Sequence, residues 1–181
     1  TCRRQRQMCI RDRESLDQHF DNPNLFDKNW YDLNDIFSSA KSFPIWNDGE
    51  SYVMSITAEA QTMFANQNML DAVGAGIPTT FDELLSTGKK LKSGDVAGVA
   101  MRSKADGSAG TWPCGGFVFS NGGVVIQDGK CMLDSPEAIE AVQYYGSILN
   151  EAGPLGVGNY HWYECLNDYM QEAVAIGLDS S

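Results

Sequence analysis

The chain has 181 residues, of which 43% are hydrophobic and 20% charged, and its formal net charge is −11. This length allows one domain, or one domain with part of another, and the composition is typical of globular proteins. The negative charge disfavours nucleic acid and anionic lipid as partners and suits a neutral or cationic ligand. No apolar stretch of the sequence has the length of a membrane span.

The first thirteen residues differ from the rest, since they hold five arginines and a single acidic residue. One interpretation is a basic arm that binds nucleic acid or anionic lipid. We favour another, because Met8–Arg13 is what the bases ATG TGT ATA AGA GAC AG(A) encode, and these resemble a transposon adapter used in sequencing. We therefore exclude residues 1–13 from fold reasoning and expect the natural sequence to begin near Glu14, inside a longer gene. No signal peptide is visible, and in a fragment that says nothing about secretion.

Three of the five cysteines lie outside this leader, at Cys114, Cys131 and Cys165. Their number is odd and no C-x-x-C pair occurs, so neither a zinc site nor a dense disulfide framework is expected. A single Cys114–Cys131 bridge remains an open alternative.

The first third of the chain predicts little regular structure. Residues 14–43 are polar and aromatic and predict loops with short helices, one of them within Asp32–Phe37. The alternation in Ser51–Ile56 predicts a strand, and Ala58–Asn66 predicts a second one. Met69–Val73 predicts a short helix that ends at two glycines.

The middle of the chain begins with a helix signal. Thr79 or Thr80 is expected to cap a helix, because Glu83 follows three residues after Thr80, as in a capping box. Ala97–Met101 predicts a short strand. Trp112–Phe119 is apolar throughout and ends at an Asn-Gly-Gly turn signal.

The last third alternates strands and helices. Residues 124–133 predict a hairpin around an Asp-Gly turn. Ser135 as cap and Pro136 at the first helical position predict a long helix. Tyr160–Met170 predicts the last helix and Ala173–Leu178 an apolar strand, so the alternation predicts an α/β domain.

Four stretches resemble the family 1 extracellular solute-binding proteins of bacterial ABC importers, especially the branch for sugars and sugar alcohols. The first two are Tyr31–Phe37 and Gly76–Leu84. The third is Leu133–Ala141, and the fourth runs through Gly153-Pro154, Gly158–Trp162, Ala173–Ile176 and Asp179–Ser181. Their order and spacing over residues 14–181 carry the resemblance.

The resemblance implies a fold of the type II periplasmic-binding-protein kind, with two α/β lobes, a hinge and a ligand between the lobes. The chain would cross the hinge near Ile56–Gln61 and return near Leu178–Ser181. Residues 14–57 would then be a remnant of the first lobe with its crossover, residues 58–178 the second lobe, and residues 179–181 the start of the return.

Two departures from the family pattern stand out. Residues 65–70 read Ala-Asn-Gln-Asn-Met-Leu in place of a Tyr-Asn-Lys-Asp-Leu-like run, and Glu172 stands where a glycine is usual before the last strand. A glycine there suits a positive φ at a helix end, which would cost a glutamate about 1 kcal/mol.

The resemblance and the fold rules together yield nine candidate ligand contacts. Sugar recognition needs flat aromatic faces and planar polar groups that make paired hydrogen bonds. The candidates are the crossing residues Glu59 and Gln61, the strand-end Arg102, Trp112, the loop residues Asn159, Tyr160 and Trp162, and the second-crossing residues Asp179 and Ser180. Six of them have a structural alternative: a hinge hydrogen bond or a solvent-facing strand position for Glu59 and Gln61, a surface charge for Arg102, a core position for Trp112, and a contact fixing a helix start for Tyr160 and Trp162.

Catalytic and metal sites find less support. His161, Glu164 and Cys165 share a helix face but have no second cluster nearby in sequence. Cys114 as a nucleophile needs a base, for which the sequence offers His19 or His161. The Gly156-x-Gly158 run lacks the third glycine of a dinucleotide loop, and no cofactor is expected.

The sequence therefore predicts a binding protein without chemistry, outside the cytoplasmic membrane, that holds a neutral sugar, oligosaccharide or polyol and delivers it to the permease subunits of an importer. Any membrane attachment would come from an N-terminal anchor missing from this fragment. Two alternatives stay open: a fragment of a carbohydrate-active enzyme, which needs a pair of carboxylates set for acid–base work, and a sugar sensor for a receptor.

Overall fold

The structure is a computed structural model that describes residues 14–32, 34–42, 44–45, 49–106 and 110–180. It divides into two compact units, residues 1–59 and 60–181. The leader of residues 1–13 lies outside the described residues, so its interpretation as an adapter stays a prediction. None of the described helices is long and apolar enough to cross a membrane.

In the part of the first unit that the structure describes there are three short helices, α2 (Asp17–Phe20), α3 (Lys28–Tyr31) and α4 (Ser38–Ser42), joined by loops. Aromatic contacts hold α2 to α3, since the ring of Phe26 lies 4.9 Å from Phe20 and 5.2 Å from Tyr31. The Tyr31 hydroxyl donates to the Ser55 carbonyl at 2.8 Å, which ties this cluster to the end of the unit.

Two predictions for the first unit are wrong. The described residues of Asp32–Phe37 form no helix. The helix at this place is α3, which ends before Asp32 because Asp32 adopts a left-handed φ of 41°. The strand expected at Ser51–Ile56 does not form, since a strand needs a neighbour and among these residues only Ser51 pairs, in an isolated bridge with Ile45.

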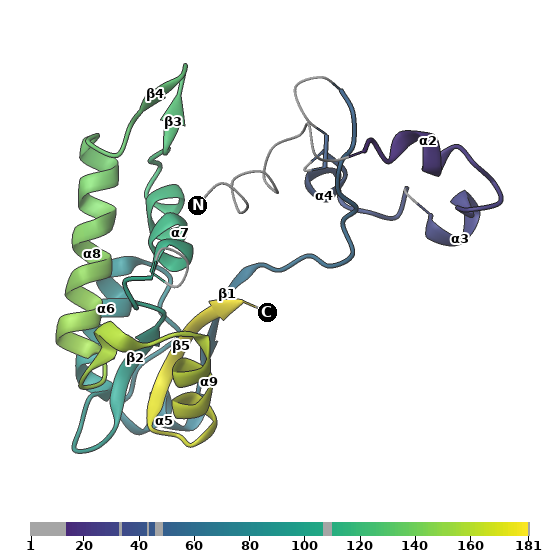
Figure 1. Cartoon of the computed structure of the whole chain (residues 1–181). Helices are drawn as coiled ribbons and strands as arrows, with labels where there is room; N and C mark the ends of the chain where they lie inside the picture. Colours follow the sequence, from purple (N-terminus) through teal and green to yellow (C-terminus); the bar gives the residue numbers. More distant parts are fainter. Residues whose placement is uncertain (1–13, 33, 43, 46–48, 107–109, 181) are drawn as a thin grey trace. The chain divides into compact units, whose positions relative to one another are not determined.

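The second unit is built on a three-stranded sheet with the order β1-β5-β2 (Figure 1). The strands are β1 (Gln61–Ala65), β2 (Ala97–Met101) and β5 (Val174–Ser180). β5 is central, antiparallel to β1 and parallel to β2. Every residue of β2 is buried, as expected of a strand covered on both faces.

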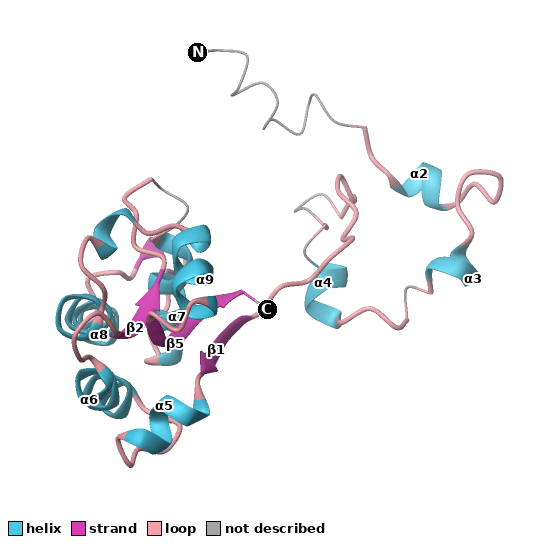
Figure 2. Ribbon diagram, turned by 90° about the horizontal axis from the view of Figure 1, so that it is seen from below, coloured by secondary structure: helices cyan, strands magenta, loops and turns pink. Residues whose placement is uncertain are grey.

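Helices cover both faces of this sheet (Figure 2). The helices α5 (Gln67–Ala72), α6 (Phe81–Leu91), α7 (Thr111–Ser120) and α8 (Pro136–Ala152) contribute to the larger core, and α9 (Trp162–Met170) packs on the other side. A 3₁₀ turn, Val157–Asn159, precedes α9. A hairpin of β3 (Ile126–Gln127) and β4 (Lys130–Cys131) lies between α7 and α8 in sequence.

Local signals set the ends of the long helices. The Thr80 hydroxyl accepts from the Glu83 N–H at 3.2 Å, and the Glu83 carboxylate accepts from the Thr79 N–H at 2.7 Å. The first bond satisfies a first-turn donor of α6. The Thr79 N–H and the Thr79 hydroxyl, which both donate to the carboxylate, lower the pKa of Glu83. The Ser135 hydroxyl caps α8 through the Ala138 N–H at 3.3 Å, with Pro136 in the first turn.

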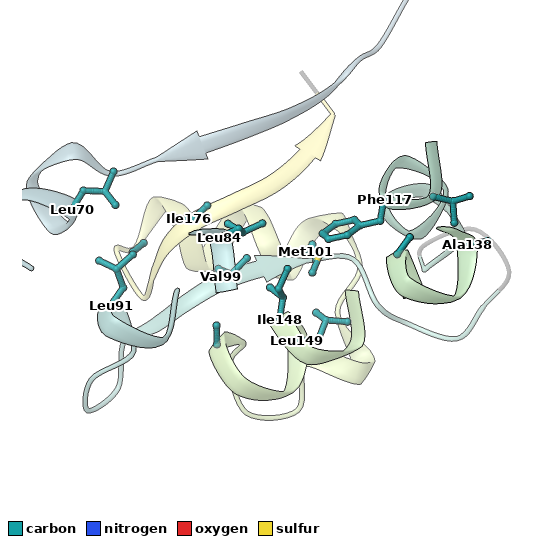
Figure 3. Close-up of a cluster of buried hydrophobic side chains, with 14 residues drawn as sticks. Leu70, Leu84, Leu91, Val99, Met101, Phe117, Ala138, Ile148, Leu149 and Ile176 are labelled. Carbon is teal, nitrogen blue, oxygen red and sulfur yellow. The ribbon is translucent and has the colours of Figure 1, made fainter. Parts of the chain in front are cut away.

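The larger core lies between the sheet and the α6–α8 layer, and Figure 3 shows its main side chains. Val99 and Met101 from β2, Ile176 from β5 and Ile148 from α8 are completely buried. The rings of Phe81 and Phe117 stack at 4.5 Å and hold α7 against α6.

Two glycines allow α6 to approach β2 closely. A Cβ on Gly98 would overlap the backbone carbonyl of Gly88. A Cβ on Gly88 would lie 2.7 Å from Val99 Cγ2 and 2.8 Å from Ala152 Cβ, so α8 closes the same contact. Glycine at both positions therefore sets the distance between this helix layer and the sheet.

Most predictions for the second unit are confirmed. The structure has the expected β1, β2 and β5, the helices α5, α6 and α8, and the Asp-Gly hairpin turn, with φ of 50° at Asp128 and 75° at Gly129. The last helix begins at Trp162 rather than Tyr160. The apolar run at Trp112–Phe119 is helical. The alternative of a Cys114–Cys131 bridge is wrong, since both thiols are free.

The departure at Glu172 has the predicted consequence. Glu172 adopts a φ of 58° immediately after the end of α9. Its N–H donates to the Tyr169 carbonyl at 3.1 Å, and the Ala173 N–H donates to the Asp168 carbonyl at 2.8 Å. These two bonds form a Schellman motif, whose left-handed position is usually glycine.

We expect Gly98→Ala to destabilise the chain by about 2–3 kcal/mol, because the added methyl meets a backbone carbonyl that cannot move without separating α6 from β2. Urea unfolding followed by circular dichroism measures the change. Gly146→Ala is the matched control: a Cβ there meets nothing within 4 Å, so we expect a gain of about 0.5–1 kcal/mol from helix propensity. Equal effects of the two substitutions would contradict the close-packing interpretation.

We expect Glu172→Gly to stabilise the chain by about 0.5–1 kcal/mol, because glycine adopts the left-handed conformation without the Cβ penalty. The same urea unfolding measures it. Gln171→Gly serves as control, since Gln171 has an ordinary φ of −88° and glycine there only adds unfolded-state entropy. A loss of stability in Glu172→Gly as large as in the control would show that the backbone at residue 172 is not strained.

Candidate ligand-binding site

The candidate site lies where three strands begin or end at one edge of the sheet. Because β2 and β5 are parallel, their carboxyl ends meet, and this places Arg102, just after β2, beside Asp179 and Ser180 at the end of β5. β1 runs the other way, so its first residue, Gln61, pairs with Ser180. Ligands of open α/β sheets bind outside the carboxyl ends of the strands.

Arg102 and Asp179 form the centre of this edge. Arg102 Nε lies 2.9 Å from Asp179 Oδ1 and 3.0 Å from Oδ2, and its Nη2 also bonds Oδ1. Nη2 donates further to the Ser180 hydroxyl at 3.0 Å. The two charged side chains are only 16% and 18% exposed, so the ion pair is partly shielded from water, which strengthens it. Multiple bonds from one planar guanidinium fix its orientation.

Trp112 covers this pair from the first turn of α7. Its ring centre lies 6.0 Å from the Arg102 guanidinium carbon, within the range of a cation–π contact. The indole is 37% exposed, so part of its face is open to a ligand. Gln61 donates from its side-chain nitrogen to the Trp112 carbonyl. Five of the nine predicted residues therefore lie in one connected cluster: Gln61, Arg102, Trp112, Asp179 and Ser180.

Tyr145, on α8, contacts the backbone of the cluster at Arg102. Its hydroxyl donates to the Arg102 carbonyl at 2.6 Å, and its ring meets Phe117 edge-on at 5.7 Å. Burial raises the pKa of Tyr145 well above its usual value, so the hydroxyl stays protonated and keeps donating at any physiological pH. This contact fixes the backbone from which the Arg102 side chain departs.

Two hollows lie beside the ion pair. One, of about 220 Å³, is lined by Gln61, Trp112 and Asp179 together with the aromatic rings of Phe81 and Phe117. The other, of about 390 Å³, contains Arg102, Asp179 and Ser180 and the exposed face of Trp162. Its remaining wall is largely apolar and comes from Phe64, Cys165, Leu166, Tyr169, Met170, Gly177 and Leu178. A small ligand can therefore meet aromatic faces and paired polar groups in the same place.

Three predicted residues lie elsewhere. Glu59 belongs to the first unit and is exposed. Asn159 lies in the 3₁₀ turn and lines neither hollow. The Tyr160 hydroxyl donates to Asp168 at 2.6 Å, and its ring packs against the smaller core, so burial raises its pKa to about 12. The Tyr160 carbonyl also accepts from the Ser103 and Lys104 N–H groups, which favours the structural alternative for this residue.

The cysteines and His161 do not form a reactive group in the described part of the chain. Burial raises the pKa of Cys114, and burial and the nearby Asp179 raise that of Cys165 to about 12, so neither is a thiolate near neutral pH. The Glu164 carboxylate accepts from the His161 N–H at 2.9 Å. Within residues that the structure describes, no three metal-binding side chains are arranged to hold an ion.

Sequence reasoning missed several residues of the site. Tyr145 had no distinguishing signal, because it falls on the apolar face of a long helix, where a core position is the simplest interpretation. Phe64 and Tyr169, whose rings lie 6.1 Å apart, form a wall of the larger hollow. The alternation of β1 was a usable signal for Phe64, since its side chain faces away from the larger core.

Comparison with known proteins agrees with this architecture. Residues 15–181 match the family described as bacterial extracellular solute-binding protein. Among solved structures, the chain is similar to an ABC transporter solute-binding protein from Agrobacterium vitis with bound D-mannitol, at a TM-score of 0.76 and 19% identity over 93% of this chain. It is also similar to one from Agrobacterium radiobacter in complex with ribitol (TM-score 0.77, 22% identity, 93% of this chain) and to maltose-bound MalE3 of T. maritima (0.78, 20%, 93%).

These likenesses confirm the expected α/β fold with the architecture of periplasmic binding proteins. The chain covers 40% of the Agrobacterium vitis structure and 42% of each of the other two, so it spans about two fifths of their length. Each of the three is less than 25% identical to this chain, so what they share with it is the fold.

A double-mutant cycle tests the ion pair at the centre of the site. We expect Arg102→Met, Asp179→Asn and the double variant to yield a coupling free energy of about 1–2 kcal/mol, because a shielded multidentate pair exceeds an exposed one. Urea unfolding supplies the four stabilities. The control is the pair of Lys89 and Glu151, 2.5 Å apart with side chains 52% and 45% exposed, for which about 0.5 kcal/mol or less is expected. Equal coupling in the two cycles would show that burial adds nothing to the Arg102–Asp179 pair.

Proposed function

Because the chain belongs to the family of bacterial extracellular solute-binding proteins, we propose that it is part of the substrate-binding component of an ABC importer. It captures a neutral sugar, oligosaccharide or polyol outside the cytoplasmic membrane. One observation carries this proposal: the Arg102–Asp179 ion pair lies at the strand ends, and its Asp179 lines both the hollow that contains Trp112 and the hollow that contains Trp162.

The chemistry of these groups fits a polyhydroxylated ligand. A sugar or polyol presents C–H groups, which pack on indole faces, and neighbouring hydroxyls, which bond to planar carboxylate and guanidinium groups. Asp179 accepts, Arg102 donates and the Ser180 hydroxyl does both. The rigid ion pair orients these atoms before the ligand arrives, which reduces the entropic cost of binding.

A neutral ligand fits better than an anion. The Arg102 guanidinium is already bound to Asp179 by several hydrogen bonds, so an anionic ligand would have to compete with that carboxylate. The chain as a whole has a formal net charge of −11, which adds long-range repulsion. A ligand hydroxyl can instead donate to the carboxylate oxygens of Asp179 without breaking their hydrogen bonds to Arg102.

The complete protein would hold the ligand between two lobes. In this proposal residues 14–57 are the remnant of the first lobe, residues 58–178 the second, and residues 179–181 the start of the return crossover. Closure of the lobes excludes water from the ligand and presents the closed form to the permease subunits.

The two hollows beside the ion pair do not favour the enzyme alternative. The family comprises binding proteins, and among the described residues that line the two hollows Asp179 is the only carboxylate. Acid–base hydrolysis of a glycoside needs two. Asp179 is moreover held by Arg102, which suits a fixed hydrogen-bond acceptor.

Calorimetric titration of the complete protein tests the function. We expect binding of at least one member of a panel of mannitol, ribitol, tagatose and maltose, and no binding of glycerol 3-phosphate. Asp179→Ala and Trp112→Ala should each weaken affinity by about tenfold or more, because each removes a contact to a buried ligand. Glu151→Ala, an exposed carboxylate on α8, is the control and should bind normally.

Two outcomes would contradict the proposal. Unchanged affinity in both the Asp179 and the Trp112 variants would show that these residues do not form the ligand-binding site. Tighter binding of glycerol 3-phosphate than of the sugars and polyols would show that the ligand is not neutral. Residues 14–181 alone are expected to bind sugar poorly, because only one side of the cleft is then present.

A further inference from the structure

Gln61 is an exposed residue, and its side-chain carboxamide is turned towards α7. Its nitrogen donates to the Trp112 carbonyl in the first turn of that helix. The rest of its carboxamide lies against Gly116, one turn further along, where an added Cβ would overlap Oε1 and would lie 2.6 Å from Cδ and 2.9 Å from Nε2. Both polar atoms of Gln61 therefore face the helix.

Gly116 makes this arrangement possible. Any side chain at residue 116 would occupy the volume in which the Gln61 carboxamide lies. The neighbouring Gly115 is different, since a Cβ there meets nothing within 4 Å. Of these two adjacent glycines, only Gly116 is needed for the contact between β1 and α7.

The contact closes a ring of interactions around the candidate site. Gln61 holds the backbone of Trp112, the Trp112 ring lies over Arg102, and Arg102 binds Asp179 and Ser180. Ser180 pairs with Gln61 across β5 and β1. Each member is thus held on two sides by others, and Gln61 is the only member that connects β1 to α7.

We propose that Gln61 is a positioning residue that seats Trp112 over the ion pair through Gly116, and that it does not itself bind the ligand. The proposal rests on the proposed function, since it assigns Trp112 as the aromatic platform of the site. The carbonyl of Trp112 lies in the first turn of α7, so a bond to it fixes both the start of the helix and the direction in which the indole departs. Loss of the bond would leave the indole free to rotate away from Arg102.

The first experiment needs no ligand. In the complete protein, all tryptophans other than Trp112 are replaced by phenylalanine, and Gln61→Met is introduced, which keeps the length of the side chain and removes its donor. We expect Trp112 fluorescence to shift to longer wavelength, its anisotropy to fall, and its acrylamide quenching to rise about twofold. Gln67→Met is the matched control, because Gln67 donates to Asp71 on α5 at 2.7 Å, away from the site. Unchanged Trp112 fluorescence in Gln61→Met would overturn the proposal.

The second experiment separates positioning from direct contact. In the otherwise unaltered complete protein, Gln61→Met should weaken sugar binding about fivefold, as expected for one lost hydrogen bond. In a Trp112→Ala background the same substitution should have no further effect. An equal fivefold loss in that background would mean that Gln61 touches the ligand, and the proposal would fail.

The glycine pair supplies an independent check. Gly116→Ala should reproduce the fluorescence change of Gln61→Met, whereas Gly115→Ala should not. In a Gln61→Ala background, Gly116→Ala should cause no further change in fluorescence. If the fluorescence responds as expected but Trp112→Ala leaves affinity unchanged, Gln61 still positions Trp112, and it is the site assignment of the proposed function that fails.

Discussion

The parallel pairing of β2 with β5 is the constraint on which the candidate site depends. Residues 77 positions apart, Arg102 and Asp179, become neighbours only because Met101 pairs with Leu178 in that register. A slip of one residue would turn the side chains of β2 to the opposite face of the sheet and separate the ion pair. The site is therefore a property of the register, and the register is held by what packs on the two strands.

That packing is tight on the α6–α8 side. The close approach at Gly88 and Gly98 allows α6 to cover β2 without a gap, and Val99 and Met101 fill the space towards α8. Tyr145 then connects this layer to the site, since its ring belongs to the core and its hydroxyl binds the Arg102 carbonyl. A buried hydroxyl with one well-aligned acceptor is costly to displace, so Arg102 starts from a fixed backbone.

The sequence predicted the elements of the second unit well, because turn residues, caps and apolar runs agree there with the tertiary structure. It also predicted that Arg102 lies at a strand end, whereas Asp179 and Ser180, expected after the last strand at a hinge crossing, are the final residues of β5. It did not predict that Arg102 and Asp179 bind each other, since that depends on the register. It also missed the role of Tyr145, whose sequence position looks like that of any core aromatic residue.

The strand expected at Ser51–Ile56 does not form, because alternation describes the faces of a strand and says nothing of whether a partner strand is present. The run at Trp112–Phe119 had no clear period, and its helix depends on tertiary contacts: Phe81 stacks on Phe117, and Gln61 fills the space beside Gly116.

Under the proposed function, the same contacts explain how a site with a full positive and a full negative charge would select an uncharged ligand. The ion pair is satisfied within the protein, so its net field at a distance is small, while its outer lone pairs and N–H groups remain strongly polar nearby. A ligand that covers the pair removes its remaining water and strengthens the attraction between the two charges. A polyol replaces the lost water bonds with its hydroxyls, whereas an apolar molecule leaves them unmade and an anion opposes Asp179. In this proposal, selection depends on keeping Arg102 and Asp179 together, through the register of β2 and β5 and the contact of the Trp112 ring with Arg102.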